Sequence, residues 1–503
     1  MQEGVAAVPV DAGPAAVGAF VVYILVILAI GVASTRFSSA GISEYFVGGR
    51  RMHRFVVALS AVVSGRSAWL LLGVTGMAYA RGASAVWAVV GYTAVELLLF
   101  LVFAPRLRRF SGRHDCITVP DYFAARFDDR SGALRTLLVA VILVFMVGYV
   151  AGQFVGGGKA FAASFGLSPT GGVLLTAGIV LAYTMTGGFL AVSLTDMIQA
   201  IFMLFALVAL PAIATAQLGG PGPVLAELAA LDPGLVDPTA LSLGAAIGFL
   251  GIGLGSPGSP HILARYMSIA DARQLRVSAW IGTAWNVLMA AGALWIGLVG
   301  RAWYPDVAML PGADTENLYP VLAQQHLPPV LFGAVVASIF AAIMSTADSQ
   351  LLVAASAVVR DVYEKVLRRG GEVPQRRLVL LSRLVVSALV LLAVGFGLAA
   401  DQLVFWLVLF AWAGLGAAIG PTSILALFWR RTTRPGVVAG VVAGTLTTVG
   451  WYFTPVLKAR MYELVPGFAA GLAATVVVSL LTSPPPGAEA LVADGTEDAP
   501  PPA

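Results

Sequence analysis

Residues 240–260 read ALSLGAAIGFLGIGLGSPGSP, an apolar stretch of membrane-spanning length that runs into glycine, serine and proline from Gly251 to Pro260. Glycine and proline interrupt helices, and the bilayer core offers no water to the backbone groups that an interruption frees. Such a break is tolerated where it is buried in protein or lines a binding cavity. The stretch therefore predicts a broken membrane helix at a functional site, with close helix packing at small residues as the alternative.

The whole chain has the composition of a membrane protein. Of its 503 residues, 59% are hydrophobic and only 11% are charged, whereas a soluble domain carries roughly 25% charged residues. The net charge of +4 comes from arginines in short loops, so it indicates membrane topology and not a nucleic-acid-binding surface. The single cysteine, Cys116, excludes an internal disulfide and a thiolate metal site.

Thirteen apolar segments recur along the chain, and about 20 residues suffice for one membrane crossing. They lie near residues 15–34, 55–80, 84–105, 134–156, 171–188, 190–216, 240–258, 277–300, 329–357, 378–399, 402–429, 436–453 and 463–482. We predict an all-α integral membrane protein with thirteen transmembrane helices over 15–482. It is preceded by an N-terminal segment over 1–14 and followed by a Pro-, Ala- and Gly-rich tail over 483–503, which we predict to be disordered.

Basic residues set the orientation, because cytoplasmic loops carry an excess of lysine and arginine. The loops after odd-numbered segments hold 24 of the 30 basic residues, Arg265 among them, and the other loops hold five. We therefore place the N-terminus outside and the tail in the cytoplasm of a bacterial-type inner membrane.

A second segment is broken at a corresponding place. Ser64-Gly65-Arg66-Ser67 interrupts segment two, and the run from Gly251 interrupts segment seven. The two segments lie five apart and cross in opposite directions, as an inverted repeat over about 55–216 and 240–429 requires. We predict that a substrate is held near the midplane between the breaks, close to Ser64, Gly65, Arg66 and Ser67 on one side and Ile252 and Ser256 on the other.

The predicted spans contain four ionisable candidates: Arg66, Glu96, Asp196 and Asp348. Each costs at least about 2.5 kcal/mol at the bilayer centre unless it is paired or solvated. Asp196 and Asp348 lie at similar depths, at about 1.5 Å of rise per residue. Near them Ser345, Thr346 and Ser349 offer the hard oxygen ligands that a small alkali cation needs. Alternatively, the aspartates pair with loop arginines and the hydroxyls bond back to their own helix.

Arg66 and Glu96 both lie near mid-span, which predicts an ion pair between them. An unpaired guanidinium at a broken helix would be costly and would repel a cation from the site. Two alternatives remain open: Arg66 reaches solvent or helix-end carbonyls, or it binds a substrate carboxylate.

Six strings between about residues 40 and 430 carry a family resemblance. They are YFVGGR (45–50), ALSA (58–61), VPDYFAARF (119–127), GGFLAVSLTD (187–196), PHILARYM (260–267) and MSTADSQLL (344–352). Together they resemble the sodium:solute symporter family, and within it the bacterial sodium/proline symporters. The resemblance implies a LeuT-type five-plus-five inverted-repeat core with further helices at both ends.

The resemblance also implies ligand positions. The family's main sodium site would take backbone carbonyls and two hydroxyls, here from Val63, Arg66, Ala342, Ser345 and Thr346. Asp196 matches an aspartate that is important for sodium coupling in relatives, some of which have a second sodium site there, and we place Ser349 beside it. Tyr149 matches a substrate-side tyrosine, and Gln153 follows one turn later as a polar contact.

The chain departs from the proline transporters at two places. It reads Gly65-Arg66 where they have an acidic residue and a methionine, and Ile252 and Ser256 where they enclose proline with a tryptophan and a tyrosine. An aromatic enclosure is worth about 1–3 kcal/mol. On these residues we expect proline to be a poor ligand.

We predict a secondary transporter, not an enzyme, that carries a small organic solute into the cell with sodium by alternating access. The solute is an amino acid such as proline, or an organic acid. Besides sodium as the coupling ion we expect no cofactor, and the lone histidines His53, His114, His261 and His326 are assigned surface or structural roles. The alternatives are a sodium-independent or proton-coupled transporter in which Arg66 replaces the cation, and a membrane sensor, against which the short tail counts.

Overall fold

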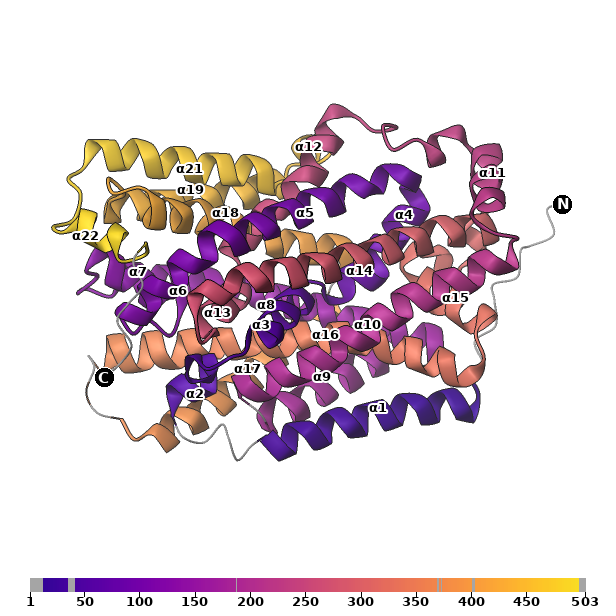
Figure 1. Ribbon diagram of the computed structural model, residues 1–503, viewed down its shortest axis with the longest axis horizontal. Helices are drawn as coiled ribbons and strands as arrows, with labels where there is room; N and C mark the ends of the chain where they lie inside the picture. The colour runs from indigo at the N-terminus through magenta and orange to yellow at the C-terminus, as the bar shows by residue number, and fades with distance from the viewer. Residues whose placement is uncertain are drawn as a thin grey trace.

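The computed structural model describes residues 12–34, 41–186, 188–368, 371, 373–399 and 403–496. Regular structure in these ranges is helical, apart from one isolated bridge between Met52 and Ile269. Most of the long helices run along the longest axis of the molecule, side by side (Figure 1). The predicted all-α membrane fold is confirmed.

Each of the thirteen predicted segments coincides with a helix or with a helix in pieces. The long helices are α1 (Gly13–Ser34), α8 (Ala133–Phe165), α9 (Pro169–Thr186), α10 (Phe189–Gln217), α14 (Leu275–Trp303), α16 (Pro329–Ser356), α17 (Gln375–Ala399), α18 (Val404–Phe428), α19 (Arg434–Tyr452) and α21 (Leu464–Leu481). Nine helical stretches of the described residues are long and apolar enough to span a membrane. The number of crossings, thirteen, stays a prediction.

The remaining spans are helices in pieces. Segment two comprises α3 (Arg54–Ser64), the π-helical turn η3 (Trp69–Val74) and α4 (Thr75–Arg81); segment three comprises α5 (Val86–Leu98), η5 (Leu99–Phe103) and α6 (Ala104–Arg113). Segment seven comprises α12 (Leu243–Gly251), the 3-10 turn η7 (Ile252–Gly258) and α13 (Pro260–Ser268). Short helices outside the spans include α2 (Ile42–Val47), α7 (Val119–Phe127), α11 (Pro221–Leu231), α15 (Leu318–His326), α20 (Pro455–Lys458) and α22 (Ala488–Ala493).

Both predicted helix breaks are present. α3 ends at Ser64, and the chain turns through Ser67 at a φ of +41° before helix resumes at Trp69. The second break also packs tightly: a Cβ on Gly253 would meet the Gly91 carbonyl at 2.4 Å, and one on Gly258 would meet the Leu415 carbonyl at 2.3 Å. The glycines thus interrupt the helix and let η7 approach the α5 and α18 backbones.

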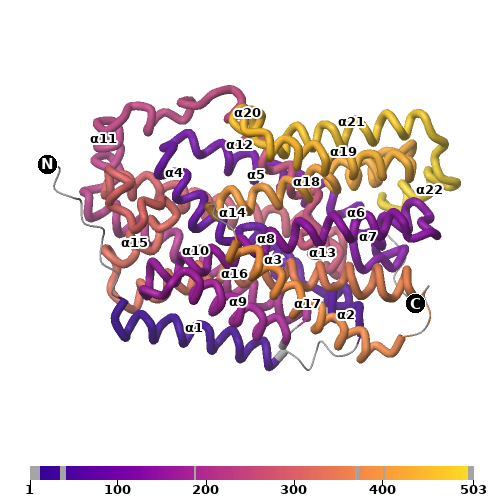
Figure 2. The backbone as a smooth tube through the Cα atoms, turned by 180° about the vertical axis from the view of Figure 1, so that it is seen from behind, coloured from indigo at the N-terminus to yellow at the C-terminus, as the bar shows by residue number. Residues whose placement is uncertain are grey.

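Helices α16 and α18 form the centre of the bundle. In each, 83% of the most apolar window is buried, against 28% for α1 and for α21. α1 and α21 lie at opposite edges of the molecule in both views (Figures 1 and 2). The end helices are therefore peripheral, and the functional candidates lie on the central ones.

The tail differs in part from the predicted disorder. Helix α22 lies within it, Glu489 pairs with Arg430, and Asp494 pairs with Arg113 and His114. Tail composition alone favoured disorder, but acidic side chains beside basic loops of the bundle provide an anchor. Residues 497–503 lie outside the described residues.

Candidate sodium and solute site

Four of the five predicted sodium ligands gather where α3 ends against α16. The Ser345 hydroxyl donates to the Val63 carbonyl (3.4 Å) and to the Ala342 carbonyl (3.1 Å), and the Thr346 hydroxyl lies 3.5 Å from the Val63 oxygen. Both hydroxyls are buried. We call these four residues the Ser345 cluster; it brings together carbonyl and hydroxyl oxygens only, the ligand type that hard cations prefer.

The fifth predicted ligand, Arg66, contributes less directly. Its backbone amide donates to the Val63 carbonyl (3.0 Å), and its own carbonyl accepts an amide of the following turn (2.9 Å). Its side chain belongs to a different group of residues, described below. The backbone of Arg66 thus lies beside the Ser345 cluster while its charge is directed elsewhere.

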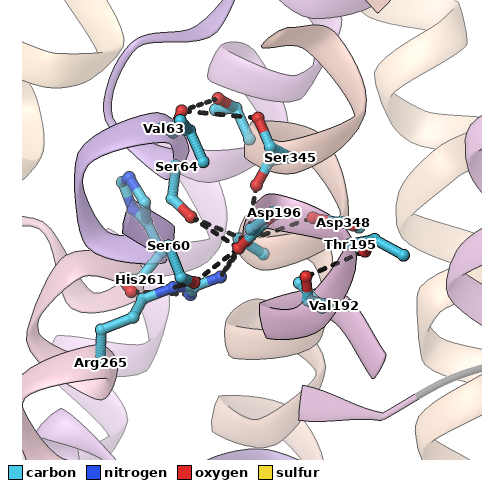
Figure 3. Close-up of polar contacts among 12 residues, drawn as sticks. Ser60, Val63, Ser64, Val192, Thr195, Asp196, His261, Arg265, Ser345 and Asp348 are labelled. Carbon is cyan, nitrogen blue, oxygen red and sulfur yellow. Dashed lines mark hydrogen bonds and ion pairs between the residues drawn. The ribbon is translucent and has the colours of Figure 1, made fainter. Parts of the chain in front are cut away.

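A second polar group, the Asp196 cluster, adjoins the first (Figure 3). Oδ2 of Asp196 accepts from Ser60 (2.6 Å) and Ser64 (3.4 Å). The Ser349 hydroxyl lies 3.3 Å from that of Ser64 and donates to the Ser345 carbonyl (2.6 Å). An unbroken chain of oxygens therefore links Asp196 to the Ser345 cluster.

Arg265 completes the Asp196 cluster. Its Nη2 lies 3.3 Å from Asp196 Oδ2 and donates to Ser349, its Nε donates to Ser60 (3.1 Å), and its Nη1 donates to the His261 carbonyl (2.8 Å). The side chain is buried, with 1% exposure. The positively charged guanidinium of Arg265 therefore lies between the side chains of Asp196 and Ser349.

This position corrects the sequence analysis, which counted Arg265 among the loop cations. The helix resumes at Pro260 and carries Arg265 inward on α13. The sequence left open that Asp196 pairs with a loop arginine. Asp196 does pair with an arginine, but this arginine lies on helix α13 and not in a loop. Even without Arg265, the loops after odd-numbered segments still hold most of the basic residues, so the predicted orientation is the same.

Asp348 lies at the edge of the same cluster. It is buried on α16, and its Oδ1 accepts from the Ser349 hydroxyl (3.1 Å). In the described part of the chain, Oδ2 of Asp348 and Oδ1 of Asp196 have no hydrogen-bond partner. If both carboxylates are ionised, the cluster carries two negative charges against one positive charge.

A third group, the Arg66 triad, joins Arg66, Glu96 and Asn286. Nη2 of Arg66 meets Glu96 Oε2 at 2.5 Å, and its Nε donates to Asn286 Oδ1 (2.8 Å). Asn286 Nδ2 also donates to Glu96 Oε2 (2.8 Å). Arg66 is 1% exposed, so its side chain does not reach solvent.

An aromatic pocket lies between the two breaks. It is lined by Gly65, Trp69, Tyr92, Tyr149, Ile252, Val408, Leu409 and Trp412. The Trp412 indole donates to the Ile252 carbonyl (2.8 Å), and its ring lies 5.8 Å from that of Tyr92. The pocket encloses only about 10 Å³ in this state, so a solute enters only when its walls move apart.

A larger cavity of about 630 Å³ leads to this pocket from the predicted outer side. The two share Ile252 and Leu409 as lining residues. Between them Phe405 stacks on Trp69, with ring centroids 6.0 Å apart. A thin aromatic layer thus separates the pocket from the cavity.

The predicted substrate residues fall into different groups. Gly65, Tyr149 and Ile252 line the pocket, whereas Ser64 belongs to the Asp196 cluster and Arg66 to its triad. The other three are buried outside these groups. The Gln153 side chain accepts a hydrogen bond from the Ala68 amide (2.9 Å), and the Ser67 hydroxyl accepts one from the Trp69 amide (3.1 Å). The Ser256 hydroxyl has no partner among the described residues.

Sequence reasoning missed several residues of the site. Tyr92 and Trp412 line the pocket, and Asn286 joins the Arg66 triad. Two features of the sequence could have identified two of them: Trp412 stands among small residues at 411–420, and Asn286 is an amide within an apolar span. His261, assigned a surface or structural role, is fully buried with its ring 6.2 Å from Tyr149, and neither ring nitrogen has a partner in the described ranges.

Comparison with solved structures identifies the fold. The fold matches that of a Na⁺-coupled sialic acid symporter in a substrate-bound outward-open state, with a TM-score of 0.79 and 20% identity over 94% of this chain and 99% of that one. A nucleobase-cation-symport-1 family transporter in a closed conformation matches with a TM-score of 0.53 and 12% identity, over 91% and 99% of the chains. The fold is of the LeuT type that these two proteins share.

Sequence comparison gives the family. The sodium:solute symporter family profile matches residues 45–444. The osmoregulated proline transporter OpuE of Bacillus subtilis is 36% identical over 467 residues, covering 92% of this chain and 94% of that protein. A sodium/proline symporter of Staphylococcus aureus is 37% identical over 480 residues, covering 92% of each. The chain belongs to the sodium:solute symporter family, and is a multi-pass plasma-membrane transporter that carries a small solute with sodium.

Proposed function

We propose that this protein takes up proline, or a small cyclic amino acid like it, together with one sodium ion. The observation that carries the proposal is the Ser345 cluster, whose oxygens meet at the first helix break beside the aromatic pocket. A ligand at this position touches both the broken helix and α16, so it can favour one arrangement of the two over another. Coupling requires such a difference in affinity between states.

The aromatic lining supports proline as the solute. The sequence argument against proline rested on Ile252 and Ser256, which replace an aromatic pair of the proline transporters. Trp412 and Tyr92 supply aromatic surface over the same break, from α18 and α5. The names of the relatives, proline transporter and sodium/proline symporter, agree with this assignment.

The Asp196 cluster supports a stoichiometry of one sodium. Relatives with a second sodium site would place that ion near Asp196 and Ser349, where Arg265 donates to both side chains. The excess negative charge of the cluster, if Asp348 is ionised, still favours a cation at the adjoining Ser345 cluster. The hydrogen bonds from Arg66 to Glu96 and Asn286 argue against Arg66 as a substitute for the cation.

The orientation remains part of the proposal. The solute would enter through the outer cavity, pass the Phe405–Trp69 layer and reach the aromatic pocket. Sodium would bind first at the Ser345 cluster and be released to the cytoplasm, where the tail lies.

The proposal is tested by the melting temperature of the purified protein against amino acids and organic acids, with and without sodium. A ligand that binds the folded state raises the apparent stability. We expect L-proline to raise the melting temperature in sodium chloride and not in choline chloride. A rise with proline that is equal in both salts would favour the sodium-independent alternative, and a rise only with organic acids would contradict proline.

A further inference from the structure

The two residues by which this chain departs from the proline transporters at the first break, Gly65 and Arg66, both contact one side chain, Tyr92. The Arg66 guanidinium carbon lies 3.6 Å from the centroid of the Tyr92 ring. The Tyr92 hydroxyl lies 3.4 Å from the Gly65 carbonyl. The two neighbouring residues that differ from the proline transporters thus contact the same tyrosine ring.

Gly65 makes room for the Tyr92 hydroxyl. A Cβ at position 65 would stand 2.4 Å from that oxygen, well inside van der Waals contact. The backbone of Gly65 has a φ of −92°, which any residue adopts, so no positive φ requires glycine here. The tyrosine hydroxyl is therefore the main obstacle to a side chain at position 65, with Ile262 Cδ1 next at 3.3 Å.

Arg66 fixes the ring itself. Tyr92 and Glu96 are four residues apart on α5, so they share one face of the helix. Glu96 and Asn286 hold the guanidinium on two sides, and its plane is then available to cover one face of the Tyr92 ring. A desolvated cation over an aromatic face is strongly attractive.

The pocket lies on the other side of this arrangement. Tyr92 lines the aromatic pocket with Trp69 and Trp412, whereas Arg66 does not line it. We infer that Arg66 is a positioning residue: with Gly65 it holds Tyr92 in place as a wall of the solute pocket, and it does not bind the solute carboxylate. The inference rests on the proposed location of the solute site and concerns how that site selects its solute.

The first test exploits the Gly65 contact. Gly65→Ala should push Tyr92 into the pocket and raise the KM for L-proline on the order of tenfold, because the displaced ring would take space that the solute needs and lose its aromatic contacts. Adding Tyr92→Phe removes the oxygen that the new Cβ would meet, and should restore the KM to within about twofold of the Tyr92→Phe value. A Gly65→Ala defect that Tyr92→Phe leaves unchanged would overturn the inference.

The second test removes Arg66 together with its partner charge, so that no carboxylate is stranded. Arg66→Met/Glu96→Gln should raise the KM for L-proline and the Ki for the competitor L-prolinamide, in which a neutral amide replaces the carboxylate, by similar factors. Arg430→Met/Glu489→Gln, which removes a surface arginine–glutamate pair, is the matched control and should leave both values unchanged. If the apparent affinity for L-proline falls and that for L-prolinamide does not, Arg66 binds the solute carboxylate instead.

A third measurement does not depend on the solute, so it separates this inference from the proposed function. A ¹⁹F spectrum of 3-fluorotyrosine at position 92 should show one narrow resonance in the otherwise unchanged chain. In the Arg66→Met/Glu96→Gln variant the resonance should split or broaden if the ring exchanges slowly between orientations, or move to an averaged position if it exchanges quickly. A resonance with unchanged position and width in the variant would overturn the positioning role, while failure of proline to bind the unchanged chain would sink the proposed function alone.

Discussion

Two buried arginine–carboxylate pairs contact the first broken helix, and they are built differently. In the Arg66 triad, the guanidinium meets Glu96 at 2.5 Å and Asn286 bonds to both partners. In the Asp196 cluster, Arg265 stands 3.3 Å from Asp196 and shares it with serine hydroxyls that lead to the Ser345 cluster. The first pair is closed on itself, whereas the second is part of an open chain of oxygens.

This difference in hydrogen bonding indicates that the two arginine–carboxylate pairs have different roles. The side-chain hydrogen bonds of Arg66 and Glu96 stay within the triad, although Arg66 Nη1 and Glu96 Oε1 have no hydrogen-bond partner among the described residues, so the triad can fix the structure around it without exchanging partners. An open pair next to hydroxyl oxygens offers its carboxylate to any cation that arrives. We therefore assign the Arg66 triad to the shape of the pocket and the Asp196 cluster to the electrostatics of sodium binding.

The largest expected effect is the loss of one member of the closed pair. Arg66→Met should lower the free energy of unfolding by about 3–5 kcal/mol, because it leaves Glu96 charged and buried without its partner. The folded yield in detergent should fall sharply and should recover when Glu96→Gln is added. If the losses of the two single variants simply add in the double variant, the pair is not a closed unit.

A smaller effect, with a dependence on sodium, is expected at the open pair. Arg265→Gln should destabilise the protein in choline chloride, and sodium should restore more stability than in the unchanged chain, because the ion can take the place of the guanidinium beside Asp196. The measurement is the melting temperature against sodium concentration. Arg126→Gln is the control, since this buried arginine donates to the Ala426 carbonyl; an equal sodium effect in both variants would contradict the assignment.

The same comparison predicts the stoichiometry. With Arg265 in place, one positive charge should move with each proline, and the reversal potential in proteoliposomes measures this ratio directly. In Arg265→Gln the ratio should rise towards two as a second sodium enters. A ratio of two in the unchanged chain would show that Arg265 does not occupy the second cation position.

The smallest effect is expected at the tail, where the ion pairs are at the surface. Although partial burial opposes it, hydrogen bonds from Arg113 and His114 hold the pKa of Asp494 below its ordinary value. A depressed pKa means that this contribution to docking is present above the ordinary pKa and is lost as the pH falls through the lower one. At neutral pH, Asp494→Asn should cost at most about 1 kcal/mol.

The docked tail can be followed by limited proteolysis of residues 484–496. Cleavage should be faster in Asp494→Asn than in the unchanged chain at about 0.1 M salt, and the two should converge near 1 M, where the Debye length falls from roughly 10 Å to roughly 3 Å. Equal rates at low salt would show that the pairs do not hold α22 in place.

The sequence predicted the membrane fold because span length and apolar composition are local properties. It also predicted both helix breaks, since glycine, serine and proline act on their own backbone. Ser345 and Thr346 were predicted from their hydroxyls near the buried aspartates, and Val63 came from the motif resemblance. Contacts across long separations were beyond one sequence: Arg66 meets Asn286 from 220 residues away, and Trp412 covers Ile252 from 160.

Arg265 shows why the remaining error arose. The predicted seventh segment ended near residue 258, and an arginine just beyond a span end is normally a loop cation. In the fold, Pro260 begins the next helix instead of ending the last one. Proline is well suited to the first turn of a helix, so its presence alone does not distinguish the two cases.

Binding of sodium at the Ser345 cluster can be tested with the double variant Ser345→Ala/Thr346→Ala. Proline uptake by proteoliposomes should be measured with and without a sodium gradient, beside the control Ser356→Ala, whose hydroxyl on the same helix bonds only to the Val353 carbonyl among the described residues. We expect the double variant to fold normally and to lose sodium-stimulated uptake, while the control retains it. Unchanged sodium stimulation in the folded double variant would show that sodium does not bind at the Ser345 cluster.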